Sequence, residues 1–340
     1  MARACTRQKA PRPRDIRHGV IISGWADEAF ASIAVEPGRQ SHPMNTATLD
    51  TATPPLVLSI QSHVACGHVG NAAAVFPMQR LGIEPLAIHT VQFSNHTGHG
   101  AFTGQVFTAE HVRSIVDGLR ARGMLARCRA VLSGYLGDAA IGEVILDAVR
   151  EIREARGAVA DDFMYCCDPV IGDVGRGVFV REGITEFQRD RAVPMADVIT
   201  PNQFEFEQIV GRPLDSTSDA AALARSLGPR VVVITSLRTP DVPAGALRTL
   251  CVAGPHAWKI DTPYIDIDPL PNGMGDVFSA VFLGMLLHGA RYPKALSHAV
   301  RVLYALVSKT PPGSRDLPLV AEQNEIVWPS EDFEPEALPA

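Results

Sequence analysis

The sequence lacks three features that each define a class of protein. No apolar run reaches the length of about 20 residues that a membrane-spanning helix needs. The net charge of -6 argues against a general nucleic-acid binder, because such proteins are usually basic. The 6 cysteines form no CxxC pair and no spaced framework, which favours reduced thiols and a cytoplasmic protein. We therefore expect neither a membrane nor a nucleic acid among its partners.

The composition is that of a folded protein with two unusual ends. Apolar residues make up 46% of the 340 residues and charged residues 20%, which is typical of a soluble globular protein with a full core. Residues 1–54 have weak periodicity and many arginines near their start, which predicts a disordered or weakly packed N-terminal extension, with a transit-like segment as the alternative. Residues 311–340 contain no Lys or Arg after Arg315 and accumulate Asp and Glu, which predicts a solvated acidic tail.

Apolar runs and helical periodicities alternate between residues 55 and 310. Short apolar runs predict buried strands at residues 56–60, 86–91, 130–133, 163–170, 198–200 and 230–235. Helical spacing predicts helices over residues 71–81, 141–152, 277–287 and 293–308. Continuous apolar strands separated by helices indicate an α/β fold, with a central, mostly parallel β-sheet and helices on both faces.

Polar residues follow several of these predicted strands or begin a predicted helix. They are Ser62, Asp168, Asn202, Thr235 and Asp276. Ligands of open parallel sheets bind beyond the carboxyl ends of the strands. We therefore expect these side chains to line one crevice, although they are scattered through the sequence.

The segment 270–276 places two glycines and an aspartate directly before the apolar run 277–287. The first N–H groups of a helix lack partners and its dipole is positive there, so this end suits an anion such as phosphate. Asp276 can take a proton from an alcohol while the N–H groups hold the charge that develops on phosphorus. A kinase for a small hydroxylated molecule needs both parts. A plain glycine turn with an aspartate cap explains the same residues without catalysis, so the motif alone leaves both interpretations open.

An ordered series of short motifs supports the kinase interpretation. They are SIQSHV (59–64), GHVGN (67–71), VFPM (75–78), TVQFSNHTG (90–98), LSGYLG (132–137), CDPVIGD (167–173), TPNQFE (200–205) and GMGD (273–276). In this order they resemble the pyridoxal kinases, a family of the ribokinase-like superfamily. The resemblance implies a ribokinase-like kinase domain over residues 55–310. It also implies ATP-dependent phosphorylation of the 5′-hydroxymethyl group of pyridoxal, pyridoxine or pyridoxamine, and a homodimer.

The resemblance also implies roles for individual residues. Asp276 would be the base toward the substrate hydroxyl, and the backbone of Gly273, Met274 and Gly275 would stabilise the transferring phosphoryl group. Asp168 and Glu205 would bind Mg²⁺, and a monovalent cation such as K⁺ is left open. The residues expected to bind the vitamin are Ser62, His96, Thr97, Gly98 and Tyr135, together with Asp276. The residues expected to bind ATP are Asp168, Asp173, Thr200, Asn202, Glu205, Thr235, Thr262, Pro263, Tyr264 and Ile265.

Several alternatives stay open at this point. Asn202 and Glu205 also fit a helix N-cap and a first-turn acid, which needs no ligand. Residues 173–181 resemble a flexible loop that covers the substrate and excludes water. Met274 stands where many family members have Thr, and a small apolar residue stands there in another branch. The remaining functional alternatives are a hydroxymethylpyrimidine or sugar kinase of the same superfamily, and a non-catalytic relative that binds the vitamin or nucleotide.

Overall fold

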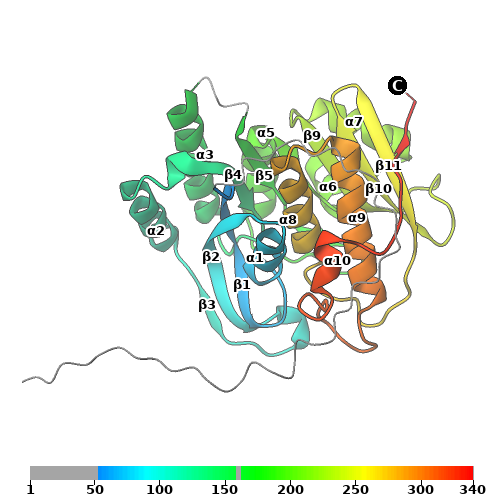
Figure 1. Cartoon of the computed structure of the whole chain (residues 1–340), viewed down its shortest axis with the longest axis horizontal. Coiled ribbons are helices and arrows are strands. Elements are labelled where there is room, and N and C mark those ends of the chain that lie inside the picture. Colours follow the sequence, from blue (N-terminus) through cyan, green and yellow to red (C-terminus); the bar gives the residue numbers. More distant parts are fainter. Residues whose placement is uncertain (1–52, 158–161, 340) are drawn as a thin grey trace, which may run out of the picture. The chain divides into compact units, whose positions relative to one another are not determined.

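A ten-stranded sheet forms the centre of the part of the chain that the computed structural model describes, residues 53–157 and 162–339 (Figure 1). The strand order is β12-β11-β10-β9-β8-β5-β4-β1-β2-β3. The strands are β1 (Leu56–Cys66), β2 (Glu84–Asn95), β3 (Gly104–Val106), β4 (Cys128–Ser133), β5 (Met164–Cys167), β8 (Val198–Ile199), β9 (Val231–Leu237), β10 (Ala246–Ala253), β11 (His256–Pro263) and β12 (Glu336–Ala337).

The central strands run parallel, and the outer strands on both sides of the sheet pair antiparallel with their neighbours. Each neighbouring pair from β2 through β1, β4, β5 and β8 to β9 is parallel. The mostly parallel sheet that the sequence predicts is therefore confirmed. The β10–β11 hairpin was not predicted, because Arg248, Lys259 and Asp261 interrupt its apolar pattern.

Helices cover both faces of the sheet. They are α1 (Asn71–Arg80), α2 (Ala109–Ala121), α3 (Ala139–Arg156), α4 (Ile184–Phe187), α5 (Val193–Met195), α6 (Gln203–Val210), α7 (Thr217–Ser226), α8 (Met274–Leu287), α9 (Tyr292–Ser308) and α10 (Gln323–Val327). Shorter elements are the 3-10 turns η1 (Thr97–His99) and η2 (Leu125–Arg127), the π-turn η4 (Gln188–Ala192) and a separate hairpin of β6 (Gly172–Asp173) and β7 (Gly177–Val178). The predicted helices over 71–81, 141–152, 277–287 and 293–308 correspond to α1, α3, α8 and α9.

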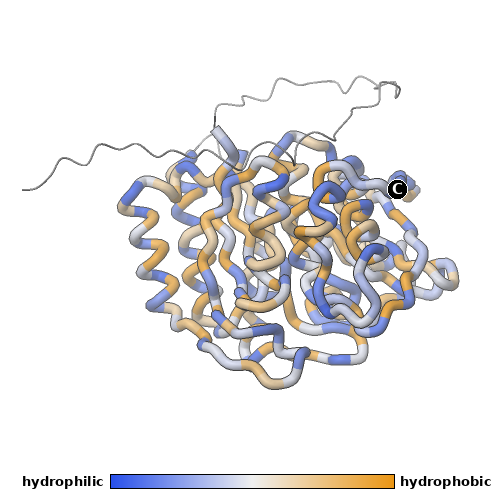
Figure 2. Tube along the Cα trace, turned by 60° about the horizontal axis from the view of Figure 1, so that its bottom comes forward, coloured by the Kyte–Doolittle hydropathy of each residue, from blue (hydrophilic) through white to orange (hydrophobic). Residues whose placement is uncertain are grey.

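Two apolar cores lie on opposite faces of the sheet. Successive strand residues point to opposite faces, so Val57 packs with α1, α8, α9 and α10, whereas Leu58 packs with α2 to α7. Cys166 and Cys167 divide in the same way, and both are fully buried free thiols. Figure 2 shows the alternation of hydrophobic and hydrophilic segments along the helices, which is the pattern of helices that cover a sheet.

The segment after α9 packs against the domain instead of extending into solvent. Leu317, Leu319 and Ile326 are buried in the same core as α8 and α9. Lys309 forms ion pairs with Glu322 and Glu325, and β12 pairs with β11. The prediction of a solvated tail is therefore wrong for residues 317–326, because ion pairs and three buried apolar residues offset the acidic composition, whereas Asp332, Glu334 and Glu336 are exposed. The predicted extension over residues 1–54 lies almost wholly outside the described residues.

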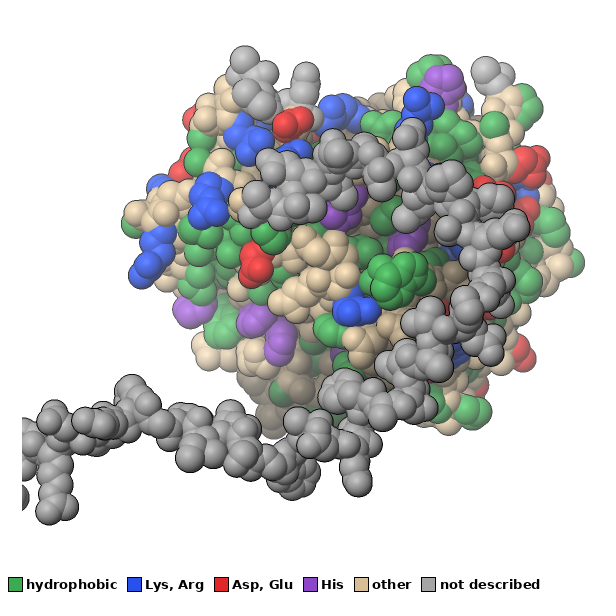
Figure 3. Space-filling model, in the orientation of Figure 1, with side chains coloured by type: hydrophobic (Ala, Val, Ile, Leu, Met, Phe, Trp, Pro, Cys, Tyr) green, Lys and Arg blue, Asp and Glu red, His purple; other side chains and the backbone are tan. Residues whose placement is uncertain are grey.

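The described residues contain no helix with both the length and the apolar character that a membrane span requires. On the face shown in Figure 3, basic and acidic side chains are interspersed among apolar and polar ones.

Candidate active site

The carboxyl ends of the parallel strands lie side by side along one edge of the sheet. The β10–β11 hairpin reaches the same edge with Ala246 and Pro263, since β10 runs antiparallel to β9 and pairs Arg248 with Leu237. The predicted residues follow the sheet order along this edge: Thr262 and Pro263 on β11, Thr235 on β9, Thr200 after β8, Asp168 after β5, Tyr135 after β4, and Ser62 on β1. We call the part from β11 to β5, which carries the residues predicted to bind ATP, the nucleotide half. We call the part from β4 to β2, which carries the residues predicted to bind the vitamin, the vitamin half.

Two of these residues lie inside strands, whereas the sequence predicts them just after strands. β1 continues past Ile60 to Cys66, because it stays paired with β2 after its pairing with β4 has ended. Ser62 is therefore a buried strand residue. Thr235 is likewise within β9, which runs on to Leu237 and pairs there with β10. Apolar runs alone underestimate the length of strands whose last residues are polar.

The N-terminus of α8 is left without a side-chain cap. Its N-cap residue Gly273 has φ 79°, and a Cβ atom there would lie 2.0 Å from the His68 carbonyl oxygen. Only glycine fits this position. Met274 packs its side chain against the core, so only its backbone can face a ligand. The Thr hydroxyl that many family members carry at this position has no counterpart here, while the N–H groups of the first helical turn stay available to an anion.

Asp276 lies in the first turn of α8, beside the loop that holds Gly70. Burial raises the pKa of Asp276 to about 6, and a hydrogen bond from the Gly70 backbone partly opposes that shift. A Cβ atom on Gly70 would lie 2.3 Å from the Ser62 hydroxyl oxygen. The structure thus brings Asp276, Gly70 and Ser62 together. A carboxylate with a pKa near 6 is ionised at neutral pH and still basic enough to accept a proton.

Asp168 is buried next to the same helix. Its carboxylate accepts a hydrogen bond from the Ser279 hydroxyl at 3.3 Å, and the hydroxyls of Ser279 and Thr200 are 2.7 Å apart. Its Oδ2 atom lies 3.6 Å from where a Cβ atom of Gly275 would be. Burial, followed by the charges of Glu205 and Asp276, raises the pKa of Asp168 well above its usual range. The sequence did not indicate Ser279, although a serine one turn after Asp276 in an apolar helix is a usable signal.

Asn202 and Glu205 form a capping box at the start of α6. The Asn202 side chain accepts from the Glu205 backbone N–H at 2.9 Å, and Glu205 Oε2 accepts from the Asn202 N–H at 2.9 Å. Glu205 Oε1 accepts from the Ile171 N–H, and Asn202 donates to the Gly172 carbonyl. The capping alternative is confirmed. Burial raises the pKa of Glu205 to about 8 despite these hydrogen bonds, so a cation beside Glu205 and Asp168 would relieve an unfavourable pair of buried acids.

The vitamin half is bordered by the η1 turn and by Tyr135. His96 Nδ1 accepts from the Gly98 N–H at 3.2 Å, so Nε2 carries the proton of the neutral ring. Burial, and then the charge of Arg176, lowers the pKa of His96 to about 4. Tyr135 is half-buried, and burial raises the pKa of its hydroxyl. Thr97 is exposed, so among the predicted residues of η1 it is His96 and Gly98 that face the rest of the protein.

The predicted covering loop over residues 173–181 forms the β6–β7 hairpin. The exposed carboxylate of Asp173 accepts from the Val174 N–H at 2.7 Å. The guanidinium of Arg176 lies 5.3 Å from the centre of the Phe179 ring, and Val178 and Phe179 are largely exposed. The hairpin is tied to the nucleotide half through the bond from Asn202 to Gly172.

A cavity lies at the end of the nucleotide half that is farther from the vitamin half. This cavity, of about 300 Å³, is lined by Arg238, Thr239, Val242, Gly245 and Tyr264. The Arg238 guanidinium lies 4.6 Å from the centre of the Tyr264 ring. Strands β8 to β10 separate this place from Asp168, so the structure does not bring residues 262–265 into contact with the buried acids. The sequence did not indicate Arg238, because only the fold places it over Tyr264.

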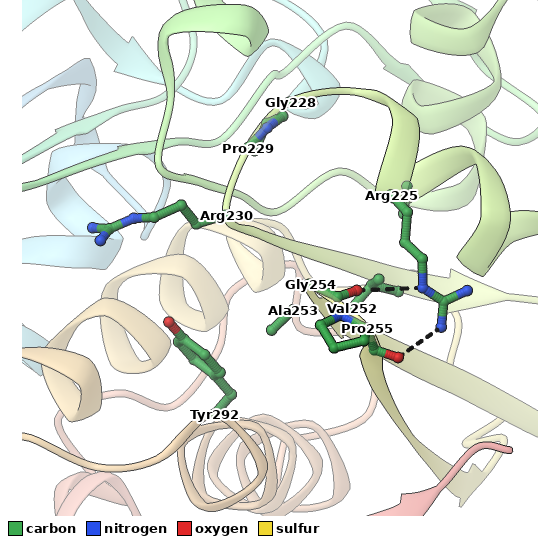
Figure 4. Close-up of a pocket in the computed structure, with 10 residues that line it drawn as sticks. Arg225, Gly228, Pro229, Arg230, Val252, Ala253, Gly254, Pro255 and Tyr292 are labelled. Carbon is green, nitrogen blue, oxygen red and sulfur yellow. Dashed lines mark hydrogen bonds between the residues drawn. The ribbon is translucent and has the colours of Figure 1, made fainter. Parts of the chain in front are cut away.

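A second cavity, of about 660 Å³, lies at the opposite edge of the sheet (Figure 4). It is bordered by the start of β9 and the end of β10. Its two arginines already have partners: Arg225 donates to the carbonyls of Gly254 and Pro255, both at 3.3 Å, and Arg230 pairs with Asp197. None of the predicted site residues borders this cavity.

The chain is similar to known kinases in sequence and in fold. The family model described as phosphomethylpyrimidine kinase matches residues 87–319. Pyridoxal kinase PdxY of Rubrobacter xylanophilus is 49% identical over 282 residues, which cover 82% of this chain and 95% of that protein. PdxY of Deinococcus radiodurans is 45% identical, covering 85% of this chain and 100% of its own length. The structure of Leishmania donovani pyridoxal kinase with ADP and pyridoxine superposes with a TM-score of 0.76 at 34% identity, over 84% of this chain and 99% of that one. The chain therefore belongs to the pyridoxal kinase family and has its ribokinase-like fold.

Proposed function

We propose that this protein is an ATP-dependent pyridoxal kinase that phosphorylates the 5′-hydroxymethyl group of pyridoxal, and of pyridoxine and pyridoxamine as related substrates. One observation carries the proposal. Asp276, with its pKa near 6, lies in the first turn of a helix whose N–H groups have no side-chain cap, and it lies beside Gly70, which is packed against Ser62. This arrangement supports a base and an anion site near the point where the two halves of the edge meet.

The residues at this junction would have different roles in phosphoryl transfer. Asp276 takes the proton of the substrate hydroxyl as the hydroxyl oxygen attacks the γ-phosphorus of ATP. The bond from the γ-phosphorus to the β–γ bridging oxygen breaks, and ADP leaves. The backbone N–H groups after Gly273 hold the charge on the transferring group, which is the main task in such reactions. The carboxylates of Asp168 and Glu205 would hold Mg²⁺, which commonly takes one or two protein carboxylates together with water and phosphate oxygens. When bound, this ion neutralises the charge on the phosphates.

The metal assignment rests on the chemistry of the donors. Among residues 53–157 and 162–339, no group of three or more His, Cys, Asp or Glu side chains is arranged to hold a metal ion. Asp168 and Glu205 nevertheless fit Mg²⁺, because both are buried acids whose pKa is raised and whose charge a cation would stabilise. We assign no described residue to a monovalent cation such as K⁺.

The remaining predicted residues would bind the two substrates. On the vitamin half, Ser62, the Nε2–H of His96 and the Tyr135 ring would orient the pyridine, with Thr97 and Gly98 at its rim. On the nucleotide half, Thr200, Asn202 and Thr235 would face the phosphates, with Asp173 over them. Residues 262–265 and the cavity between Arg238 and Tyr264 would receive the adenine, since a flat base stacks on such surfaces.

A coupled ADP-release assay with pyridoxal and Mg²⁺ tests the proposal. We expect ADP release that depends on pyridoxal and equals the pyridoxal 5′-phosphate formed. The family model is described as phosphomethylpyrimidine kinase, which makes a pyrimidine such as hydroxymethylpyrimidine the second candidate substrate. A higher kcat/KM for hydroxymethylpyrimidine or a sugar than for any vitamin B6 form would reject the pyridoxal assignment. Binding of vitamin and nucleotide without ADP release would reject catalysis and favour the non-catalytic relative.

We also infer a homodimer in the cytoplasm, on the family resemblance and the reduced cysteines. The chain mass is 36.5 kDa. Light scattering should therefore give about twice that mass, and a monomer at micromolar concentration would contradict the inference.

A further inference from the structure

The segment just after α9 touches both loops that build the phosphoryl-transfer site. Asp316 Oδ1 accepts a hydrogen bond from the His68 backbone N–H at 3.1 Å. The carboxylate fits closely here, because a Cβ atom on Gly67 would lie 2.5 Å from the same oxygen. The Ser314 hydroxyl accepts from the Asp316 N–H at 3.2 Å, which fixes the local turn.

The neighbouring residue holds the second loop. The Arg315 carbonyl accepts from the Asn272 backbone N–H at 2.8 Å and from the Asn272 side chain at 3.1 Å. Asn272 directly precedes Gly273, the N-cap residue of α8. Arg315 and Asp316 thus join the loop that enters α8 to the turn at residues 67–68, which lies far away in the sequence.

These two loops position the reacting groups. The turn at residues 67–70 ends at Gly70, whose backbone lies beside the Asp276 carboxylate. It also places the His68 carbonyl against Gly273, with no room for a side chain between them. A shift of this turn would therefore move the base and the start of the anion site together. Buried Leu317 and Leu319 follow directly, so the segment that carries Asp316 is anchored in the core.

We propose that Asp316 is a positioning residue for phosphoryl transfer. Its carboxylate holds the turn at residues 67–70 against the N-terminus of α8, and so keeps Asp276 and the N–H groups in register with the substrate hydroxyl. In this role it acts through the turn and not by contact with substrate or phosphate. This inference rests on the proposed kinase function. A carboxylate suits the task because its hydrogen bond to a backbone N–H is stronger than that of a neutral acceptor.

Two substitutions at this residue separate positioning from charge. Asp316→Asn keeps an oxygen that can accept from His68, and we expect its kcat to stay within about threefold of the unmodified protein. Asp316→Ala removes the acceptor, and we expect kcat to fall by about 10- to 100-fold, with the KM values for ATP and pyridoxal changed by less than about threefold. Glu334→Ala, an exposed acid on the same segment, is the control and should leave kcat unchanged.

A purely structural role gives a different result. In that case Asp316→Ala would lower the melting temperature but keep the kcat of the folded enzyme, and this outcome overturns the proposal. Equal losses of kcat in Asp316→Asn and Asp316→Ala also overturn it, because the hydrogen bond would then be irrelevant.

Amide hydrogen exchange supplies a readout that does not need activity. In the full-length protein, exchange over residues 67–71 should be at least about tenfold faster in Asp316→Ala than in the unmodified protein, and near the unmodified rate in Asp316→Asn. If Asp316→Ala does not fold, Gly67→Ala displaces the same carboxylate and is compared in its place. Unchanged exchange in the variant overturns positioning. Slow exchange in an unmodified protein that forms no ADP instead rejects the proposed function alone.

Discussion

Helices α6 and α8 begin at the same edge of the sheet and carry an acid at the same position, three residues after the N-cap. In α6 the acid is Glu205, which turns back to its own N-cap and closes a capping box with Asn202. In α8 the acid is Asp276, the N-cap is Gly273, and no side chain caps the helix. One helix thus satisfies its own N–H groups, while the other leaves them for a ligand. A sequence match to an N-terminal acid therefore does not by itself distinguish an acid that caps its own helix from one beside an open helix end.

The largest expected effect comes from Asp276→Asn, which keeps the shape of the side chain but removes the base. We expect kcat to fall by about 10²- to 10⁴-fold, the usual contribution of a general base. Binding of pyridoxal and ADP, followed by fluorescence or calorimetry, should change little. Normal turnover by this variant would remove Asp276 from the mechanism and leave the N-terminus of α8 without an assigned base.

Gly273→Ala should have the next largest effect on kcat, because it changes the uncapped N-terminus of α8 directly. An added Cβ would meet the His68 carbonyl and shift the N–H groups that hold the phosphoryl group. We expect kcat to fall by about 10²- to 10³-fold, as when a donor is lost from an oxyanion hole.

Gly211→Ala is the matched control for Gly273→Ala. Gly211 ends α6, has φ 77°, and has no atom within 4 Å of an added Cβ. It imposes the same backbone strain without touching the site, so it should lower stability and leave kcat unchanged. Equal losses of kcat in both variants would attribute the effect to strain alone.

Glu205→Gln should have the smallest effect, and that effect is on the free energy of unfolding of the metal-free protein. The pKa of Glu205 is about 8 in the folded protein, whereas a glutamate in the unfolded chain has its ordinary pKa of 4.5. Between these values the folded state holds a proton that the unfolded state has lost, so this residue makes the fold less stable as the pH rises. Glutamine does not titrate and can keep one bond of the capping box.

The measurement is urea unfolding of both proteins without Mg²⁺ at pH 5 and pH 8. We expect the variant to be less stable at pH 5 by about 1 kcal/mol, because it has lost one acceptor of a backbone N–H. That deficit should shrink or reverse by pH 8. A deficit that grows with pH would show that Glu205 is ionised in the fold, and that the capping box outweighs burial.

The sequence predicted the sheet and its two helical layers because both depend on local apolar patterns. It also predicted the start of α8, since glycines and an acid before an apolar run are a local signal. The β10–β11 hairpin was missed because charged residues interrupt its apolar pattern. The C-terminal segment was misjudged because composition does not show that Lys309 pairs with two of its acids.

The residues of the site that were missed share a different cause. Ser279, Arg238 and Asp316 each act on a partner that only the folded chain brings near, namely Asp168, Tyr264 and His68. No spacing in the sequence connects Asp316 with His68, which it contacts across most of the domain's length. Motifs identify the groups that react, whereas the groups that hold them in place require the structure.

The pH dependence of kcat/KM for pyridoxal tests the central claim most directly, namely that Asp276 acts as a base with a pKa near 6. The base must be ionised, so kcat/KM should be constant above that pH and fall about tenfold per pH unit below it. The residual activity of Asp276→Asn should lack this acid limb. A flat profile between pH 5 and 7, or an acid limb that persists in Asp276→Asn, would contradict the account.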